Sequence, residues 1–235
     1  MGFGRLDQIK TDRGRKMRGA NHTTLILFWI IVLIIIGVQI RAGASILPSC
    51  LLAIVLLTGG IEIPVAHKRM RKPGYTRDAV HLLEEIYSVP LERDFYEKKR
   101  FFDTIITINL GGFVIPFVAA CYLGVTSPNL ASIEIGIIMI AVTHIVAVFQ
   151  DGVGIKLPDY IGIVPLTLAL LLASGETATV AFAAGVTGIL IGLCTVLGAI
   201  DPERQGSARI SIGGAGSFQA IYVTMCFAVL ASLIA

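Results

Sequence analysis

The chain has 235 residues, of which 55% are hydrophobic and only 15% are charged, and its mean hydropathy is +0.81. A soluble domain carries about 25% charged residues to cover its surface. This composition leaves too little polar material for a water-facing shell, and with a net charge of only +3 and no nucleic-acid-binding pattern it predicts a membrane protein without a nucleic-acid partner.

The N-terminal residues 1–23 form a basic tail. Six Lys and Arg residues precede the first apolar run, and no small-residue cleavage site follows them. A cleaved signal peptide is therefore not expected. We interpret residues 1–23 as a cytoplasmic tail.

Seven apolar runs follow the tail. A helix that crosses about 30 Å of hydrocarbon needs roughly 20 apolar residues, because lipid cannot satisfy an open backbone. The runs are Thr24–Ile40, Ile46–Val65, Thr104–Gly124, Ile133–Phe149, Pro158–Ala173, Ala178–Leu197 and Ser217–Ala235. We predict an all-α integral membrane fold with about seven transmembrane helices, two in residues 24–66 and five in residues 104–235. The fifth run is short, so whether it spans fully stays open.

The orientation follows from the basic residues. All of the 19 Lys and Arg residues except Arg41 fall on one side if the N-terminus is cytoplasmic. Short cytoplasmic loops retain basic residues, whereas outer loops lose them. The sequence therefore predicts a multi-pass protein of the cell membrane with its N-terminus inside and its C-terminus outside.

Residues 67–103 form the longest polar segment. After Thr76, which can cap a helix, apolar residues recur at helical spacing, and Val89-Pro90 ends the pattern. Basic residues flank this amphipathic stretch on both sides. We predict that 67–103 is cytoplasmic and contacts the anionic lipids of the inner leaflet, with partner binding as the alternative.

The pattern Gly-Gly-x-x-Ile-Pro occurs twice, at residues 59–64 and 111–116. Paired Gly/Pro interruptions in oppositely oriented segments break helices at the binding sites of inverted-repeat transporters. Close helix packing is the alternative. We hypothesise that the two glycine pairs approach each other, that Pro64 and Pro116 break or kink their helices, and that a polar binding site forms there. Its residues would be Glu62, Asn109, Gly59, Gly60, Gly111 and Gly112. Glu62 could instead reach toward Lys68 or Arg69.

The other polar residues of the apolar runs indicate no catalytic or metal site. His144 has no second ligand at helical spacing and is interpreted as a hydrogen-bonded packing residue. Asp151 and Asp159 bracket a boundary turn, whereas aspartyl catalysis needs facing carboxylates. No cofactor motif is present. The four cysteines lie in apolar runs, and whether Cys50 and Cys121 pair stays open.

A glycine-rich loop precedes the last apolar run. Its free N–H groups and the following helix end could hold a phosphate or lipid headgroup, although the loop lacks the Gly-Lys-Ser/Thr of a P-loop. Close packing or a re-entrant turn is the alternative. The candidate residues are Arg209, Ser211, Gly213, Gly214, Gly216 and Ser217.

Several glycine motifs carry a family resemblance. The stretches 109–116, 152–155, 188–192 and 211–218 resemble the multi-pass prokaryotic membrane family called domain of unknown function 1614. The resemblance implies a membrane fold over residue 46 to the C-terminus and no established activity. It also implies acidic residues at two positions that are Cys194 and Gln219 here, so this chain resembles a divergent member without that chemistry.

Three classes of function remain at this point. The first is a non-enzymatic polytopic membrane protein, most concretely a small-solute or ion transporter or channel-like protein. The second is a structural or accessory subunit of a larger membrane complex, with membrane-protein subunits as partners. The third is an intramembrane hydrolase using Asp151 and Asp159, which the missing acidic positions and the absence of a nucleophile–base set place last.

Overall fold

The computed structural model describes residues 22–72, 80–81 and 101–233, and most of these residues are helical. A π-helix, η1 (Leu110–Val114), leads into α6, and a 3-10 turn, η2 (Asp159–Gly162), leads into α8. The α-helices are α2 (His22–Ala42), α3 (Leu47–Thr58), α6 (Ile115–Thr126), α7 (Leu130–Val146), α8 (Ile163–Leu172), α9 (Thr177–Ala199) and α10 (Phe218–Ala231). Each predicted apolar run therefore contains a helix.

The described fold is mostly helical, as predicted, but it is not all-α because it also contains a three-stranded sheet. Its strands are β1 (Glu62–Arg71), β2 (Phe101–Asn109) and β5 (Arg209–Ile212), in the order β1-β2-β5. β1 and β2 are antiparallel, whereas β2 and β5 are parallel. A separate two-stranded hairpin consists of β3 (Val148–Gln150) and β4 (Gly154–Lys156).

The strands replace parts of two predicted helices. The predicted run 46–65 is helical only to Thr58, and the predicted run 104–124 is strand up to Asn109. β2 is rich in Ile and Thr, whose β-branched side chains favour strands. Apolar composition could not distinguish a strand from a helix in these runs, and the β1 residues of the first run are mostly exposed.

The two prolines, which were predicted to break or kink their helices, lie in different kinds of structure. Pro64 lies in the edge strand β1, where the register to β2 shifts between Pro64 and Ala66. Proline is tolerated at an edge or bulge because its missing N–H is not needed there. Pro116 lies in the first turn of α6, directly after the π-helix η1. Pro64 therefore lies at an irregularity within a strand, and Pro116 lies at the change from π-helix to α-helix.

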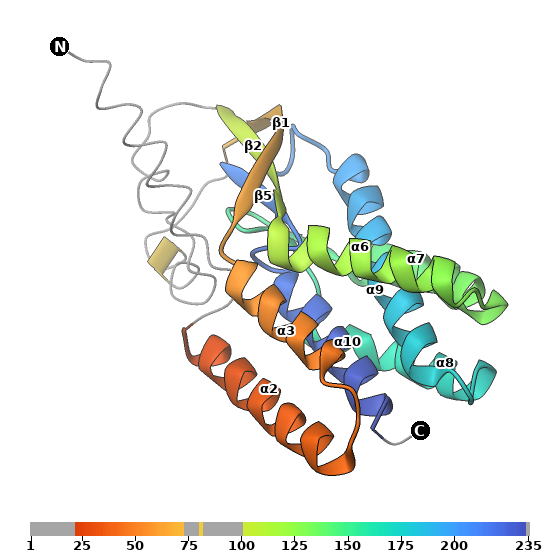
Figure 1. The fold of residues 1–235 in the computed structure, drawn as a ribbon. Helices are drawn as coiled ribbons and strands as arrows, with labels where there is room; N and C mark the ends of the chain where they lie inside the picture. Colours follow the sequence, from red (N-terminus) through yellow and green to blue (C-terminus); the bar gives the residue numbers. More distant parts are fainter. Residues whose placement is uncertain (1–21, 73–79, 82–100, 234–235) are drawn as a thin grey trace.

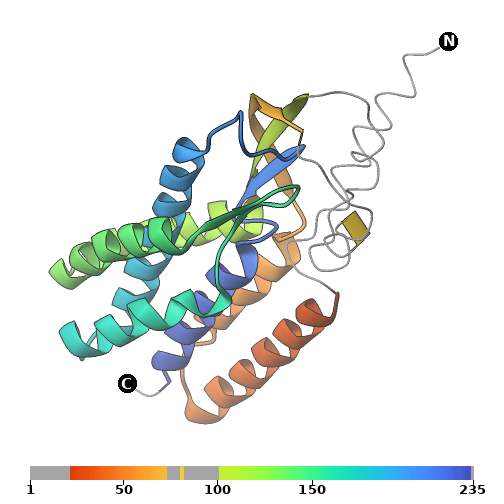
Figure 2. The same ribbon diagram turned by 180° about the vertical axis from the view of Figure 1, so that it is seen from behind.

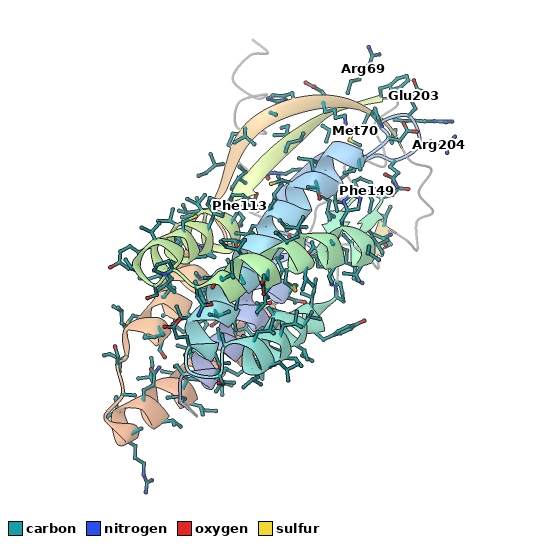
Figure 3. All side chains as sticks on the ribbon, turned by 90° about the vertical axis from the view of Figure 1, so that its right-hand side faces the viewer. Arg69, Met70, Phe113, Phe149, Glu203 and Arg204 are labelled. Carbon is teal, nitrogen blue, oxygen red and sulfur yellow. The ribbon has the colours of Figure 1, made fainter. Side chains whose placement is uncertain are left out.

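The sheet lies at one end of a layered helical body (Figure 1). The α2–α3, α6–α7 and α8–α9 connections and the C-terminus lie at the opposite end, and the view from behind agrees (Figure 2). Figure 3 shows Arg69, Glu203 and Arg204 gathered at the far end of the sheet. The chain thus separates a charged end from an end made of short connections.

Helix α9 forms the centre of the helical body and packs against α6, α7, α8 and α10. Glycines permit this close packing. A Cβ at Gly188 would overlap the Met139 side chain and lie 2.8 Å from the Gly136 carbonyl oxygen. A Cβ at Gly192 would lie 2.6 Å from the Cβ of Thr143. α7 and α9 therefore touch at backbone distance, as in small-residue helix pairs.

Two of the described helices are long and apolar enough to cross a bilayer, at Thr23–Ala42 and Thr177–Ala199. The second is mostly buried inside the protein, and the other apolar helices have 10–17 residues. The expected amphipathic helix after Thr76 and the basic tail lie largely outside the described residues. Residues 67–71 and 101–103, assigned to that amphipathic segment, are strand.

The packing of α9 predicts opposite effects for two glycine substitutions. Gly188→Ala should lower the thermal unfolding midpoint by about 2 to 12 °C, because overpacking costs about 1 to 3 kcal/mol. Gly198→Ala, in the same helix but with nothing within 4 Å of the new Cβ, should raise it through helix propensity. Unfolding of the detergent-purified variants measures both, and equal shifts of the same sign would contradict the assigned α7–α9 contact.

Candidate functional site

The carboxylate of Glu62 accepts hydrogen bonds from three side chains. The Thr107 hydroxyl donates to Oε2 at 2.5 Å, and the Asn109 amide donates to Oε1 at 3.0 Å. The Ser211 hydroxyl lies 2.7 Å from both carboxylate oxygens. We call Glu62, Thr107, Asn109 and Ser211 the Glu62 junction.

The strand register brings these residues together. Glu62 begins β1 opposite Asn109 of β2, and Thr107 of β2 is the partner of Ser211 in β5. Thr107 and Asn109 are two residues apart, so their side chains point to the same face of the sheet. Three strand segments, separated by up to 149 residues, thus present their polar side chains at one point.

Asn109 links this point to the ends of two helices. Its side-chain oxygen accepts from the Gly112 amide at 2.7 Å and caps η1, while its Nδ2 donates to the Gly59 carbonyl just after α3. The Leu110 amide also donates to the Ile61 carbonyl at 2.9 Å. Because the buried Asn109 side chain uses both its donor and its acceptor here, it fixes the path of the chain on both sides of the junction.

Glycines allow these backbones to meet. A Cβ on Gly111 would lie 2.6 Å from the Gly59 amide nitrogen, and a Cβ on Gly112 would overlap the carbonyl oxygen of Gly213. The predicted approach of the two Gly-Gly pairs is thus present for Gly59 and Gly111. Gly60 is exposed and has open space around it, so it takes no part in this contact.

The glycine-rich loop belongs to the same site. A Cβ on Gly214 would overlap both the Ser211 hydroxyl and a carboxylate oxygen of Glu62. The Ser211 hydroxyl therefore contacts a carboxylate of the protein itself. The site predicted around Glu62 and Asn109 and the site predicted in the glycine-rich loop are one site. Arg209 lies in β5, Gly216 accepts from the Leu157 amide, and Ser217 is buried at the start of α10.

Burial is uneven across the junction. Thr107, Asn109 and Ser211 are buried, whereas Glu62 is partly exposed. All three side chains that donate to the carboxylate are neutral. The alternative was that Glu62 reaches toward Lys68 or Arg69. Lys68 donates instead to the Ile200 carbonyl at 3.3 Å, and the Arg69 guanidinium lies 4.8 Å from the centre of the Phe101 ring. A partly exposed carboxylate with hydroxyl neighbours can bind a proton or a small cation.

The remaining predicted residues lie elsewhere. His144 of α7 hydrogen-bonds Thr195 of α9 at 3.1 Å, as expected of a packing histidine. Asp151 accepts from the Gly206 amide at 3.0 Å, while Asp159 is exposed in η2. No contact between these two carboxylates is present in the described part of the chain.

All four cysteines are free thiols. Cys50 on α3 and Cys121 on α6 are free, exposed thiols. Cys194 lies exposed on α9, and Gln219 is half-buried in the first turn of α10. Within the described ranges, no group of three His, Cys, Asp or Glu side chains could hold a metal ion.

Sequence reasoning missed Thr107. Residues 104–124 were interpreted as a helix, in which Thr107 and Asn109 lie on different faces. The alternation Thr107-Ile108-Asn109 was the available signal, because period two places both polar side chains together in a strand. Ser211 was identified, but for a different ligand.

The chain matches a known family model. A family model described as protein of unknown function (DUF1614) matches residues 56–231, which include the whole Glu62 junction. No curated protein and no solved structure matches the chain.

The close approach at the junction predicts a difference between two glycines. Gly112→Ala should destabilise the protein by about 2 kcal/mol or more, because the backbone carbonyl of Gly213 cannot yield as a flexible side chain would. Gly60→Ala has open space and should change the free energy of unfolding by less than about 0.5 kcal/mol. Denaturant unfolding of the two variants measures this, and a neutral Gly112→Ala would refute the contact.

Proposed function

This chain belongs to the DUF1614 family of unknown function, and we propose that it is a multi-pass membrane protein that transports a small solute or an ion. The observation that carries the proposal is the Glu62 carboxylate, which lies where helix α3 has ended and, within the described residues, accepts hydrogen bonds from neutral groups on β2 and β5. A carboxylate in this position can exchange its hydrogen-bond partners for a transported or coupling ion.

The helical structure is interrupted on both sides of Glu62 and Asn109, which supports a transport function. α3 ends at Thr58, and a π-helix rather than a regular α-helix begins after Asn109. Transporters place unwound backbone and half-helix ends around their ion sites, and π-helical turns are frequent at functional sites. Ionisable groups at membrane depth are costly, so a retained one is a functional candidate.

Two features support the proposed seven-pass topology in the cell membrane. The connections expected outside, α2–α3, α6–α7 and α8–α9, lie together at the end away from the sheet (Figure 1). In addition, α2 exposes a large apolar surface, including Leu33, Ile34 and Ile40. Helices shorter than 20 residues, such as α3 and α8, would need the bilayer to thin locally or flanking residues to complete the span.

One observation favours the accessory-subunit alternative. A groove of about 490 Å³ lies between α6, α7 and α9 and is lined mainly by apolar and small residues, among them Gly124, Gly136 and Gly188. Small residues let a second helix approach closely within a membrane. The groove fits a partner helix as well as lipid, so copurification of a stoichiometric membrane subunit would favour this alternative over transport. A hydrolase is not proposed, because nothing brings Asp151 and Asp159 together.

The topology predicts a two-sided labelling pattern. Single cysteines at Gly43 and Gly175, in a background without the native cysteines, should react with an impermeant thiol reagent added to intact cells. A cysteine at Gln205 should react only after the membrane is permeabilised. Labelling of all three positions from the same side would refute the seven-pass arrangement.

The transport proposal predicts ion movement that depends on Glu62. Protein reconstituted in liposomes should carry protons or monovalent cations down an imposed gradient, followed with trapped fluorescent indicators. Glu62→Gln should reduce this flux at least tenfold, because the neutral amide cannot bind a cation or a proton as a carboxylate does. Glu134→Gln, an exposed change on α7, is the matched control and should leave the flux unchanged. Equal flux from all three proteins and from empty liposomes would refute the proposal.

A further inference from the structure

We infer that the Glu62 junction binds a partly dehydrated monovalent cation of the Na⁺ type, with the Glu62 carboxylate and the hydroxyls of Thr107 and Ser211 as its protein ligands. The inference rests on the proposed transport function in one respect, which is that this cation is taken to be the transported or coupling ion. The binding site itself is argued from the junction.

The available atoms are oxygens that converge. Thr107 Oγ1 lies 2.5 Å and Ser211 Oγ lies 2.7 Å from the same carboxylate oxygen, Oε2. Carboxylate and hydroxyl oxygens are hard ligands that suit alkali and alkaline-earth cations rather than transition metals. His and Cys, which would select zinc or copper, are not among the atoms that contact this carboxylate in the described part of the chain.

The charge of the ligand set favours a single positive charge. Glu62 is the one ionisable group of the junction, and its neighbours Thr107, Asn109 and Ser211 are neutral. Calcium sites in proteins typically use several carboxylates. A monovalent cation would neutralise the junction, whereas a divalent cation would leave it with a net positive charge.

The hydroxyls can serve both states of the site. Each has one hydrogen and two lone pairs. Without a cation the hydrogens of Thr107 and Ser211 point to the carboxylate, and with a cation they turn away so that lone pairs face the ion. The Asn109 amide cannot do this because Nδ2 is a donor to Glu62 and to the Gly59 carbonyl. Asn109 is therefore a positioning residue that holds the carboxylate.

Gly214 packs closely against the junction, and Glu62 is partly exposed. Gly214 packs against Ser211 and Glu62 so closely that any Cβ would overlap both, which restricts the junction to a small ion. Partial exposure of Glu62 gives the ion an entry and lets water complete its coordination. The C-terminal end of α3 lies next to the site at Gly59, and the negative end of a helix dipole favours a cation.

Thermal unfolding of the full chain in detergent tests the inference, with choline chloride replacing the varied salt at constant ionic strength. NaCl should raise the unfolding midpoint in a saturable manner, by about 3 to 5 °C for each tenfold increase above the dissociation constant. KCl should act more weakly because the oxygens are closely spaced. Glu62→Gln should abolish the response and Ser211→Ala should weaken it, whereas the exposed control Ser174→Ala should retain it.

Two results would overturn the inference. One is an equal response to NaCl and choline chloride, and the other is a sodium response that persists in Glu62→Gln. If sodium has no effect while Glu62→Gln still reduces flux in liposomes, the cation site fails and proton-coupled transport stands. If sodium stabilises the wild-type chain through Glu62 but no flux is found, transport fails and the cation site stands.

Discussion

The hydrogen bonding of the Glu62 carboxylate is the interaction on which the arrangement of sheet and helices depends. Its donors come from β2 and β5, and Asn109 extends the same network to the end of α3 and the start of η1. A buried polar network specifies a unique packing only when each member is satisfied. Here one carboxylate satisfies three buried side chains, so the junction fixes how the sheet is attached to the helical body.

Glycine makes this network sterically possible. The backbones of Gly59 and Gly111, and those of Gly112 and Gly213, approach so closely that a side chain on Gly111 or Gly112 would collide. The ring of Phe218 covers the same place and stacks on Tyr222, which in turn contacts Phe28 of α2. The junction is thereby joined through α10 to α2. The hydrogen bonds of the junction and the packing of these aromatic rings therefore support the same geometry.

Much of the helical layer could be predicted from the sequence, because apolar runs and their boundaries are local properties. The convergence of Glu62 and Asn109, with the approach of Gly59 to Gly111, was also visible in the repeated Gly-Gly-x-x-Ile-Pro pattern. The sheet was not predictable in this way, because the pairing of Thr107 with Ser211 joins residues about a hundred positions apart. An apolar, β-branched run inside a hydrophobic chain favours helix and strand equally until its pairing partner is known.

A double-mutant cycle between Glu62 and Ser211 tests most directly whether the carboxylate joins β1 to β5. The free energy of unfolding would be measured for Glu62→Gln, Ser211→Ala and the double variant. The structure predicts a coupling of about 0.5 to 3 kcal/mol, because the two side chains form one hydrogen-bonded pair. Coupling of Glu62 to the distant Thr195 should be near zero. Additive effects of Glu62→Gln and Ser211→Ala would contradict the account.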